Sequence, residues 1–195
     1  MTAEQYLLPG FEAALPPINP VFFALFPPAD AAARVARVAL LLRREHELSG
    51  RPLATERFHV SLLHLDDRSR MSQATIAAAG RAVATVAMPP FDVAFDRAAS
   101  FGRGAGRRPF VLRGGDGVAG LMAFQQALGG TLKQAGLVRR AMAQYEPHVT
   151  LLYDDRPVDE QAIEVVRWTV RELVLVRSLQ GQTRHVPLAR WTLRG

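Results

Sequence analysis

The sequence contains 195 residues with a net charge of +6, and 49% of the residues are hydrophobic. This length suits a single domain with a substantial interior. Cysteine is absent, which excludes disulfides, thiolate zinc sites and a cysteine nucleophile. No stretch approaches the roughly 20 consecutive apolar residues of a membrane span. We therefore expect a cytoplasmic protein that has no membrane partner.

The basic residues are almost all arginine, and Lys133 is the only lysine. Such a surface is compatible with a polyanionic partner such as RNA, and equally with a generally basic soluble protein.

The first 19 residues contain several prolines and lack the basic start and apolar core of a signal peptide. We expect residues 1–19 to form an irregular N-terminal extension. Residues 20–195 are expected to form one bilobal domain, and the protein is expected to be a monomer.

Apolar runs and helix-breaking residues predict the first elements. Residues 21–26 form an apolar run closed by two prolines, as expected for a buried strand. Asp30 is the predicted N-cap of a helix that ends near Gly50 and whose apolar face consists of Val35, Val38, Leu41 and Leu42. Residues 58–65 form the next predicted strand, and a second helix follows with the apolar face Ile76, Ala79, Val83 and Val86.

The second half of the chain is richer in strands. Alternating apolar residues from Phe91 to Phe95 predict a strand, paired with residues 110–112 across a loop rich in glycine and arginine. A third helix has the apolar face Leu121, Phe124, Leu128 and Leu132. Three further strands are expected at residues 148–153, around 165–176 and at 186–193. The resulting order β-α-β-α-β-β-α-β-β-β predicts an α+β fold with mixed or antiparallel sheets.

Two segments of the chain resemble each other. Residues 58–63 read Phe-His-Val-Ser-Leu-Leu, and residues 147–152 read Pro-His-Val-Thr-Leu-Leu. On a strand, residues two apart project from the same face. His59 therefore shares a face with Ser61, and His148 shares one with Thr150. If the two strands lie side by side, two imidazoles and two hydroxyls line one groove.

This set of groups fits in-line cleavage of a cyclic phosphate. One imidazole can take a proton from the attacking water, and the other can give a proton to the departing ribose oxygen. The hydroxyls of Ser61 and Thr150 can hydrogen-bond the phosphate oxygens. No metal and no cofactor are required.

The paired motifs resemble those of the 2H phosphoesterase superfamily, in the branch of RNA 2′,3′-cyclic phosphodiesterases and 2′-5′ RNA ligases. Its two His-x-Thr/Ser-x motifs are matched at His59 and His148, and the likeness runs from residue 21 to residue 193. The resemblance implies a bilobal fold with two sheets, outer helices, pseudo-twofold symmetry and a central cleft. It further implies that His59 donates a proton, that His148 accepts one, and that the product carries a 2′-phosphate.

The sequence departs from the family pattern at three places. His64 stands where many relatives have an aromatic residue, Tyr153 stands where some have an arginine, and His185 stands beside Arg184 where a tyrosine is common. Tyr153 and Arg184 are taken as candidate substrate-binding residues. His64 lies an odd number of positions from His59, so on a regular strand it is expected to face away from the cleft.

Other polar residues are given ordinary structural interpretations. His46 is expected near a helix C-terminus, where the dipole favours a basic residue. The pairs Asp66-Asp67 and Asp154-Asp155 follow the two motifs and are expected to begin turns rather than to bind a metal. A basic cluster could form either a rim for RNA or a solvated loop, and it consists of Arg103, Arg107, Arg108 and Arg113.

Three functions are compatible with this sequence. The leading one is hydrolysis of 2′,3′-cyclic phosphate ends of RNA or nucleotides. The second is reversible 2′-5′ ligation of such an end to a 5′-hydroxyl, without ATP, because no nucleotide-binding loop is present. The third is an RNA- or nucleotide-binding module without catalysis, although a pure binder does not need a matched acid and base.

Overall fold

The structure is a computed structural model, and it describes residues 19–65, 72–102, 106–138, 145–179 and 184–194. The expected N-terminal extension, Asp66, Asp67 and Arg103 lie outside these residues. The described elements are β1 (Val21–Leu25), α1 (Ala29–Glu45), β2 (Val60–His64), α2 (Gln73–Ala84), β3 (Phe91–Ser100), β4 (Arg108–Arg113), α3 (Ala119–Gln134), β5 (His148–Asp154), β6 (Gln161–Val170), β7 (Glu172–Leu179) and β8 (Arg184–Thr192). Short 3₁₀ turns precede β2 (Thr55–Arg57) and α3 (Asp116–Val118).

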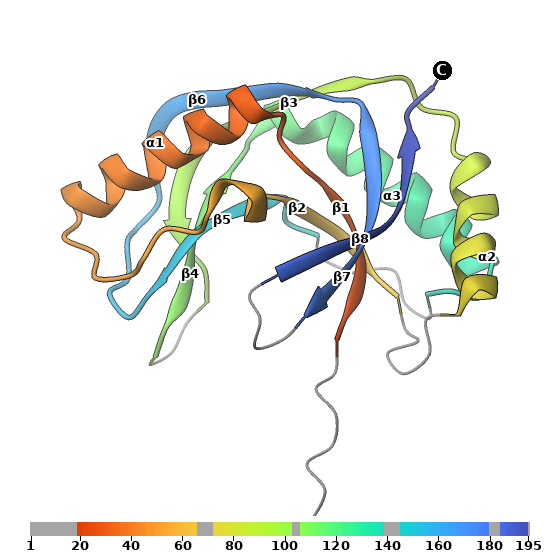
Figure 1. Cartoon of the computed structure of the whole chain (residues 1–195). Coiled ribbons are helices and arrows are strands. Elements are labelled where there is room, and N and C mark those ends of the chain that lie inside the picture. The colour runs from red at the N-terminus through yellow and green to blue at the C-terminus, as the bar shows by residue number, and fades with distance from the viewer. Residues whose placement is uncertain (1–18, 66–71, 103–105, 139–144, 180–183, 195) are drawn as a thin grey trace, which may run out of the picture.

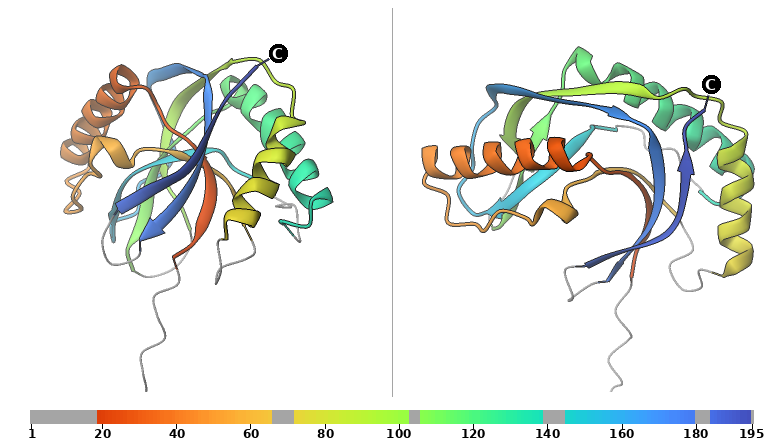
Figure 2. Two further views of the ribbon diagram at one scale, coloured as in Figure 1. Left: turned by 45° about the vertical axis from the view of Figure 1, so that its right-hand side comes forward. Right: turned by 45° about the horizontal axis from the view of Figure 1, so that its top comes forward.

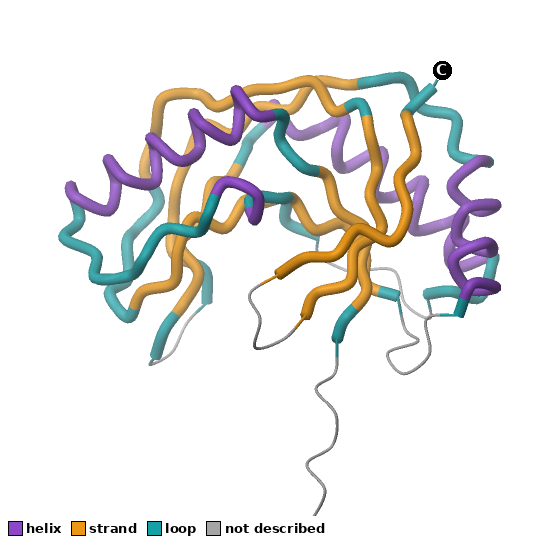
Figure 3. Tube along the Cα trace, in the orientation of Figure 1, coloured by secondary structure: helices purple, strands orange, loops and turns teal. Residues whose placement is uncertain are grey.

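The strands form two four-stranded sheets, in the orders β2-β1-β7-β8 and β5-β4-β3-β6. Each neighbouring pair of strands is antiparallel. The helices lie outside the sheets, with α1 along β6 and with α2 and α3 packed against each other (Figures 1 and 3). The predicted α+β fold with antiparallel sheets and outer helices is therefore confirmed, and each of the two motif strands belongs to a different sheet.

A continuous apolar core joins the two sheets. Phe23 and Leu25 of β1 belong to the same buried cluster as Phe95 of β3 and Phe110 of β4. The opposite face of β1 is also apolar, and Phe22 and Ala24 pack there with Val174 and Val176 of β7. The Phe23 face of β1 thus anchors its sheet in the core, while the Phe22 face supports the candidate site described below.

One predicted strand is in fact two strands. We expected a single strand around residues 165–176, but β6 ends at Val170 and β7 begins at Glu172. β6 pairs with β3, and β7 pairs with β1 in the other sheet. No glycine or proline marks the change, and Arg171 is the single residue between the two strands, whose ribbons follow one another from sheet to sheet in Figure 2. The sequence signal for a strand is therefore continuous across the boundary.

The predicted helix faces are confirmed except at Leu41 of α1, which is 63% exposed, and one predicted cap is corrected. The apolar residues predicted for α3 are buried, and α2 buries Ala79 and Val83. Asp30 was expected to be the N-cap of α1, but Pro28 occupies that position and Asp30 lies in the first turn. There its carboxylate pairs with Arg34 one turn later, at 2.9 Å. Within the described residues, no helix is both long and apolar enough to span a membrane.

The loop after α1 ends against β5. Gly50 donates its N–H to the buried Asp154 carboxylate at 2.6 Å, and Ser49 donates its hydroxyl to the same oxygen at 3.1 Å. The other oxygen accepts the N–H of Arg156 at 2.9 Å. Asp154 therefore holds the turn after β5, as predicted, and the N–H bonds lower the pKa of its carboxyl in spite of burial.

Candidate active site

The two motif strands carry the same irregularity at the same place. In β2, Leu62 is an extra residue opposite β1, because Phe23 pairs with Leu63 while Ala24 pairs with Ser61. In β5, Leu151 is the extra residue opposite β4, since Phe110 pairs with Leu152 and Val111 pairs with Thr150. Such a β-bulge adds one residue to a strand and shifts the alternation of faces beyond it. Two consecutive leucines can then both be buried in each motif.

The bulges bring further side chains to the motif face, by which we mean the side of the two sheets that carries His59, Ser61, His148 and Thr150. His64 pairs with Phe22, and the two rings are 5.3 Å apart. The expectation that His64 faces away from the histidines was therefore wrong, because it assumed a regular strand. Tyr153 stands at the corresponding position of β5 and is 44% exposed.

Aromatic rings enclose His59 at the start of β2. Phe22 and Phe26 lie 5.4 and 5.8 Å from the imidazole, between ring centroids. His185 of β8 meets it edge to face at 4.7 Å. The Nδ1 atom lies 2.7 Å from the carbonyl oxygen of Arg57. Because a carbonyl oxygen can only accept a hydrogen bond, Nδ1 of His59 carries the hydrogen. Nε2 is then the nitrogen that is available for proton transfer.

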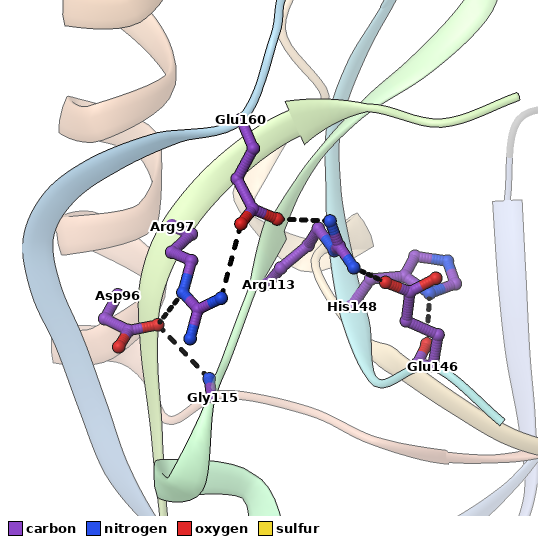
Figure 4. A network of polar contacts seen from close by, with 7 residues as sticks. All are labelled: Asp96, Arg97, Arg113, Gly115, Glu146, His148 and Glu160. Carbon is purple, nitrogen blue, oxygen red and sulfur yellow. Dashed lines mark hydrogen bonds and ion pairs between the residues drawn. The ribbon is translucent and has the colours of Figure 1, made fainter.

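His148 has a matching arrangement at the start of β5. Its Nδ1 lies 2.8 Å from the carbonyl oxygen of Glu146, again two residues earlier in the chain. The Phe101 ring packs against the imidazole at 4.8 Å. Arg113 is the cross-strand partner of His148 and forms ion pairs with Glu146 and Glu160 (Figure 4). Nε2 of His148 is therefore also the nitrogen available to a substrate.

The surroundings of the two histidines disfavour their charged forms. Burial lowers the pKa of His59 to about 4, and His185 and His148 add to this effect. Burial and the Arg113 guanidinium lower the pKa of His148. Since the charge of His148 acts on His59, the two imidazoles belong to one electrostatic site. Both are neutral near pH 7 in the free protein.

Ser61 and Thr150 are half-buried on the motif face. Tyr145, just before the second motif, donates its hydroxyl to the carbonyl oxygen of Ser61 at 3.0 Å. This bond links the segment that leads into β5 to the strand of the first motif. Burial raises the pKa of Tyr145, which keeps the phenol protonated as the donor. A tyrosine that bonds a backbone carbonyl leaves no pattern in the sequence, and this contact was not foreseen.

At the start of β8, His185 and not Arg184 is brought to His59. Arg184 is exposed, and its neighbour His185 also contacts Phe22 at 5.7 Å. Adjacent strand residues point to opposite faces, which explains the difference. Burial and Arg57 lower the pKa of His185, and its Nδ1 is buried without a hydrogen-bond partner among the described residues.

The remaining candidates make contacts with other parts of the protein. His46 caps the C-terminus of α1 as expected and contacts Phe110. Arg107 donates to the carbonyl oxygen of Tyr153 at 3.0 Å, and Arg113 is committed to its two carboxylates. Arg107 and Arg113 of the predicted basic cluster are therefore used in contacts within the protein.

Comparison with known proteins agrees with this geometry. The family model of the 2′-5′ RNA ligase superfamily matches residues 26–182. The chain belongs to the 2′-5′ RNA ligase superfamily. The resemblance to the 2H phosphoesterases read from the paired motifs is thereby confirmed. No curated protein sequence matches the chain.

Solved structures of this superfamily share the fold over almost the whole chain. A phosphoesterase is 25% identical with a TM-score of 0.70, and the alignment covers 91% of this chain and 99% of that one. LigT of E. coli in complex with 3′-AMP is 23% identical with a TM-score of 0.72, at the same coverage. The protein TT0787 of Thermus thermophilus is 20% identical with a TM-score of 0.70, covering 90% and 98%.

Proposed function

We propose that this protein hydrolyses 2′,3′-cyclic phosphates at RNA ends or on nucleotides and leaves a 2′-phosphate. The observation that carries this proposal is the matched pair of Nδ1 bonds to the carbonyl oxygens of Arg57 and Glu146. These bonds fix the tautomer of both imidazoles, so that each has Nε2 free for proton transfer. LigT of E. coli, which shares the fold, has been crystallised with 3′-AMP, and this supports a nucleotide as the ligand.

The reaction needs one base, one acid and a clamp on phosphate. Nε2 of His148 takes a proton from water while the water oxygen bonds to phosphorus. The bond from phosphorus to the ribose 3′ oxygen breaks, and that oxygen takes the proton of Nε2 on His59. The hydroxyls of Ser61 and Thr150 hydrogen-bond the phosphate oxygens and hold phosphorus in line.

The low pKa of His59 sets a condition on this assignment. An acid must carry its proton before the reaction, and His59 is neutral in the free protein at pH 7. A bound phosphate anion favours the imidazolium, because an opposite charge within a few ångströms raises the pKa of a histidine. Substrate binding therefore prepares the acid in this scheme.

A turnover assay on a 2′,3′-cyclic mononucleotide tests the activity. We expect hydrolysis that persists in excess chelator, because the two motifs supply the acid, the base and the phosphate clamp. Activity that disappears with chelator and returns with a divalent cation would contradict the mechanism. Tight equilibrium binding of the same nucleotide without turnover would point to a binding module.

The superfamily name makes ligation the second candidate. In ligation the 5′-hydroxyl of an RNA replaces water as the nucleophile: His148 takes its proton, the bond from phosphorus to the ribose 3′ oxygen breaks, and that oxygen takes a proton from His59. The two histidines exchange roles only in the return reaction, in which the 2′-5′ linkage is cleaved to the cyclic phosphate. Adding an RNA with a free 5′-hydroxyl to the hydrolysis assay separates the two reactions. A product longer than the input strands would favour ligation, and strands of unchanged length that end in a 2′-phosphate would favour hydrolysis.

A further inference from the structure

The two contacts that orient His148 both come from groups held by one arginine. The imidazole is fixed by the carbonyl oxygen of Glu146, at 2.8 Å from Nδ1, and by the ring of Phe101, at 4.8 Å. Arg113 forms an ion pair with the Glu146 carboxylate, and its guanidinium carbon lies 5.6 Å from the centre of the Phe101 ring. Figure 4 shows the Arg113 guanidinium between Glu160 and Glu146.

We propose that Arg113 is a positioning residue for His148: it holds the peptide unit and the aromatic ring that fix the imidazole. The inference rests on the proposed function only where it predicts turnover. Its structural part, the orientation of His148, stands without that function.

The charges around Arg113 form a chain that leads away from the site. Glu160 bridges Arg113 and Arg97, and Arg97 is 3.3 Å from Glu160 and 3.5 Å from Asp96. Arg113 is thus anchored from the β3 side through Glu160 and contacts the site through Glu146. Only an arginine, with several donors in one plane, can serve both carboxylates and still lie against a ring.

Stability is a weak explanation for this arrangement. The side chains of Arg113, Glu146 and Glu160 are 33, 49 and 38% exposed. Ion pairs exposed to this degree contribute about 1 kcal/mol or less each. A residue that adds little stability but contacts both supports of a catalytic imidazole is better explained by orientation.

Three charged or titratable groups act on or adjoin His148. His59 lies across from it on the β2 side, Arg113 lies beside it on β4, and Glu146 precedes it in its own segment. Arg113 lowers the pKa of His148, as a nearby cation does, while the carboxylates partly compensate that charge. Removing Arg113 should therefore change both the orientation of the ring and its titration.

The test compares Arg113→Met with Arg97→Met in the full chain. Both arginines pair with Glu160, but Arg97 makes no recorded contact with Glu146, Phe101 or His148 within the described residues. In ¹⁵N spectra of the imidazoles, we expect His148 of the wild type to be the Nδ1–H tautomer. Arg113→Met should give a mixture of tautomers and a higher pKa for His148, and Arg97→Met should give neither.

Turnover provides a second readout. We expect kcat to fall on the order of 10-fold in Arg113→Met, with KM nearly unchanged, because the loss concerns the geometry of proton transfer. Arg113→Lys should retain only part of the wild-type kcat, since one lysine cannot form both ion pairs in this geometry. An unchanged His148 tautomer and pKa in Arg113→Met, or equal changes in both variants, would overturn the inference.

Failure of the proposed function and failure of the Arg113→Met variant to fold can be distinguished from failure of the inference. If the wild type does not hydrolyse cyclic nucleotides, the proposed function fails while the spectra of His148 still test Arg113. If Arg113→Met does not fold, the exposed Glu146→Gln removes the same ion pair from the other side. It should also loosen the tautomer of His148, and an unperturbed ring in that variant would overturn the inference.

Discussion

The imidazoles of His59 and His185 meet edge to face, with 4.7 Å between their centroids. The first belongs to a conspicuous motif, and the second lies far along the chain, next to an exposed arginine. Their contact makes the histidine site asymmetric, because His148 has a phenylalanine ring as its aromatic neighbour.

This contact predicts a shift in titration. His185→Phe keeps an aromatic ring against His59 but removes a group that can carry positive charge. The pKa of His59 should therefore rise from about 4 toward its ordinary value, and only in part, because burial remains the largest cause. Nuclear magnetic resonance titration of the imidazole measures it, with His46→Gln as a control outside the site. An unchanged pKa of His59 would mean that His185 does not act on it.

Removing either motif histidine should abolish most of the turnover. His59→Ala and His148→Ala should each lose about 10²–10⁴-fold in kcat on a 2′,3′-cyclic nucleotide, the usual cost of a positioned proton-transfer group. Both variants should stay folded, because these imidazoles lie on the motif face and not in the main core. His46→Ala, at the end of α1, should keep its activity. Normal turnover in either motif variant would exclude the paired mechanism.

The two hydroxyls should matter less than the imidazoles. Ser61→Ala and Thr150→Val each remove one hydrogen bond to a charged phosphate, and we expect losses of about 10–10²-fold. Steady-state kinetics on the same nucleotide compares them with the histidine variants. Losses as large as those of the histidines would indicate that a hydroxyl takes part in proton transfer.

Product identity tests the direction of the reaction. If His59 protonates the 3′ oxygen while His148 activates water opposite it, in-line geometry allows a single leaving oxygen. Phosphorus spectra should then show the 2′-phosphate alone. A 3′-phosphate would require the roles of the two histidines to be exchanged, and a mixture would require two binding poses.

Gly50 should be required for stability because β5 runs directly beside it. A Cβ atom at Gly50 would lie 2.2 Å from the carbonyl oxygen of Tyr153, so the loop or the strand must move. We expect Gly50→Ala to lower the free energy of unfolding by about 3 kcal/mol, as overpacking does. Gly130→Ala is the control, since nothing lies within 4 Å of its Cβ and alanine favours the helix. Chemical denaturation compares the two variants, and equal stabilities would contradict the packing argument.

The features that could be predicted from the sequence are those that depend on hydrophobic periodicity and on motif spacing. The apolar faces of α2 and α3 and the pairing of β3 with β4 follow from local patterns, and so did the family. The face of His64 could not be predicted, because alternation gives no sign of the extra residue at Leu62. The boundary at Arg171 was missed because a single residue, neither glycine nor proline, separates the two strands. The contact of His185 with His59 depends on the pairing of distant strands, which no local pattern records.

The crossing at Arg171 also joins the sheet of the first motif directly to the sheet of the second. A single residue separates the last residue of β6 in one sheet from the first of β7 in the other, and Leu193 donates to its carbonyl oxygen at 2.9 Å. One residue spans at most about 3.6 Å, so this connection between the sheets is short. The connection therefore restricts how far the two sheets, and with them His59 and His148, can move apart.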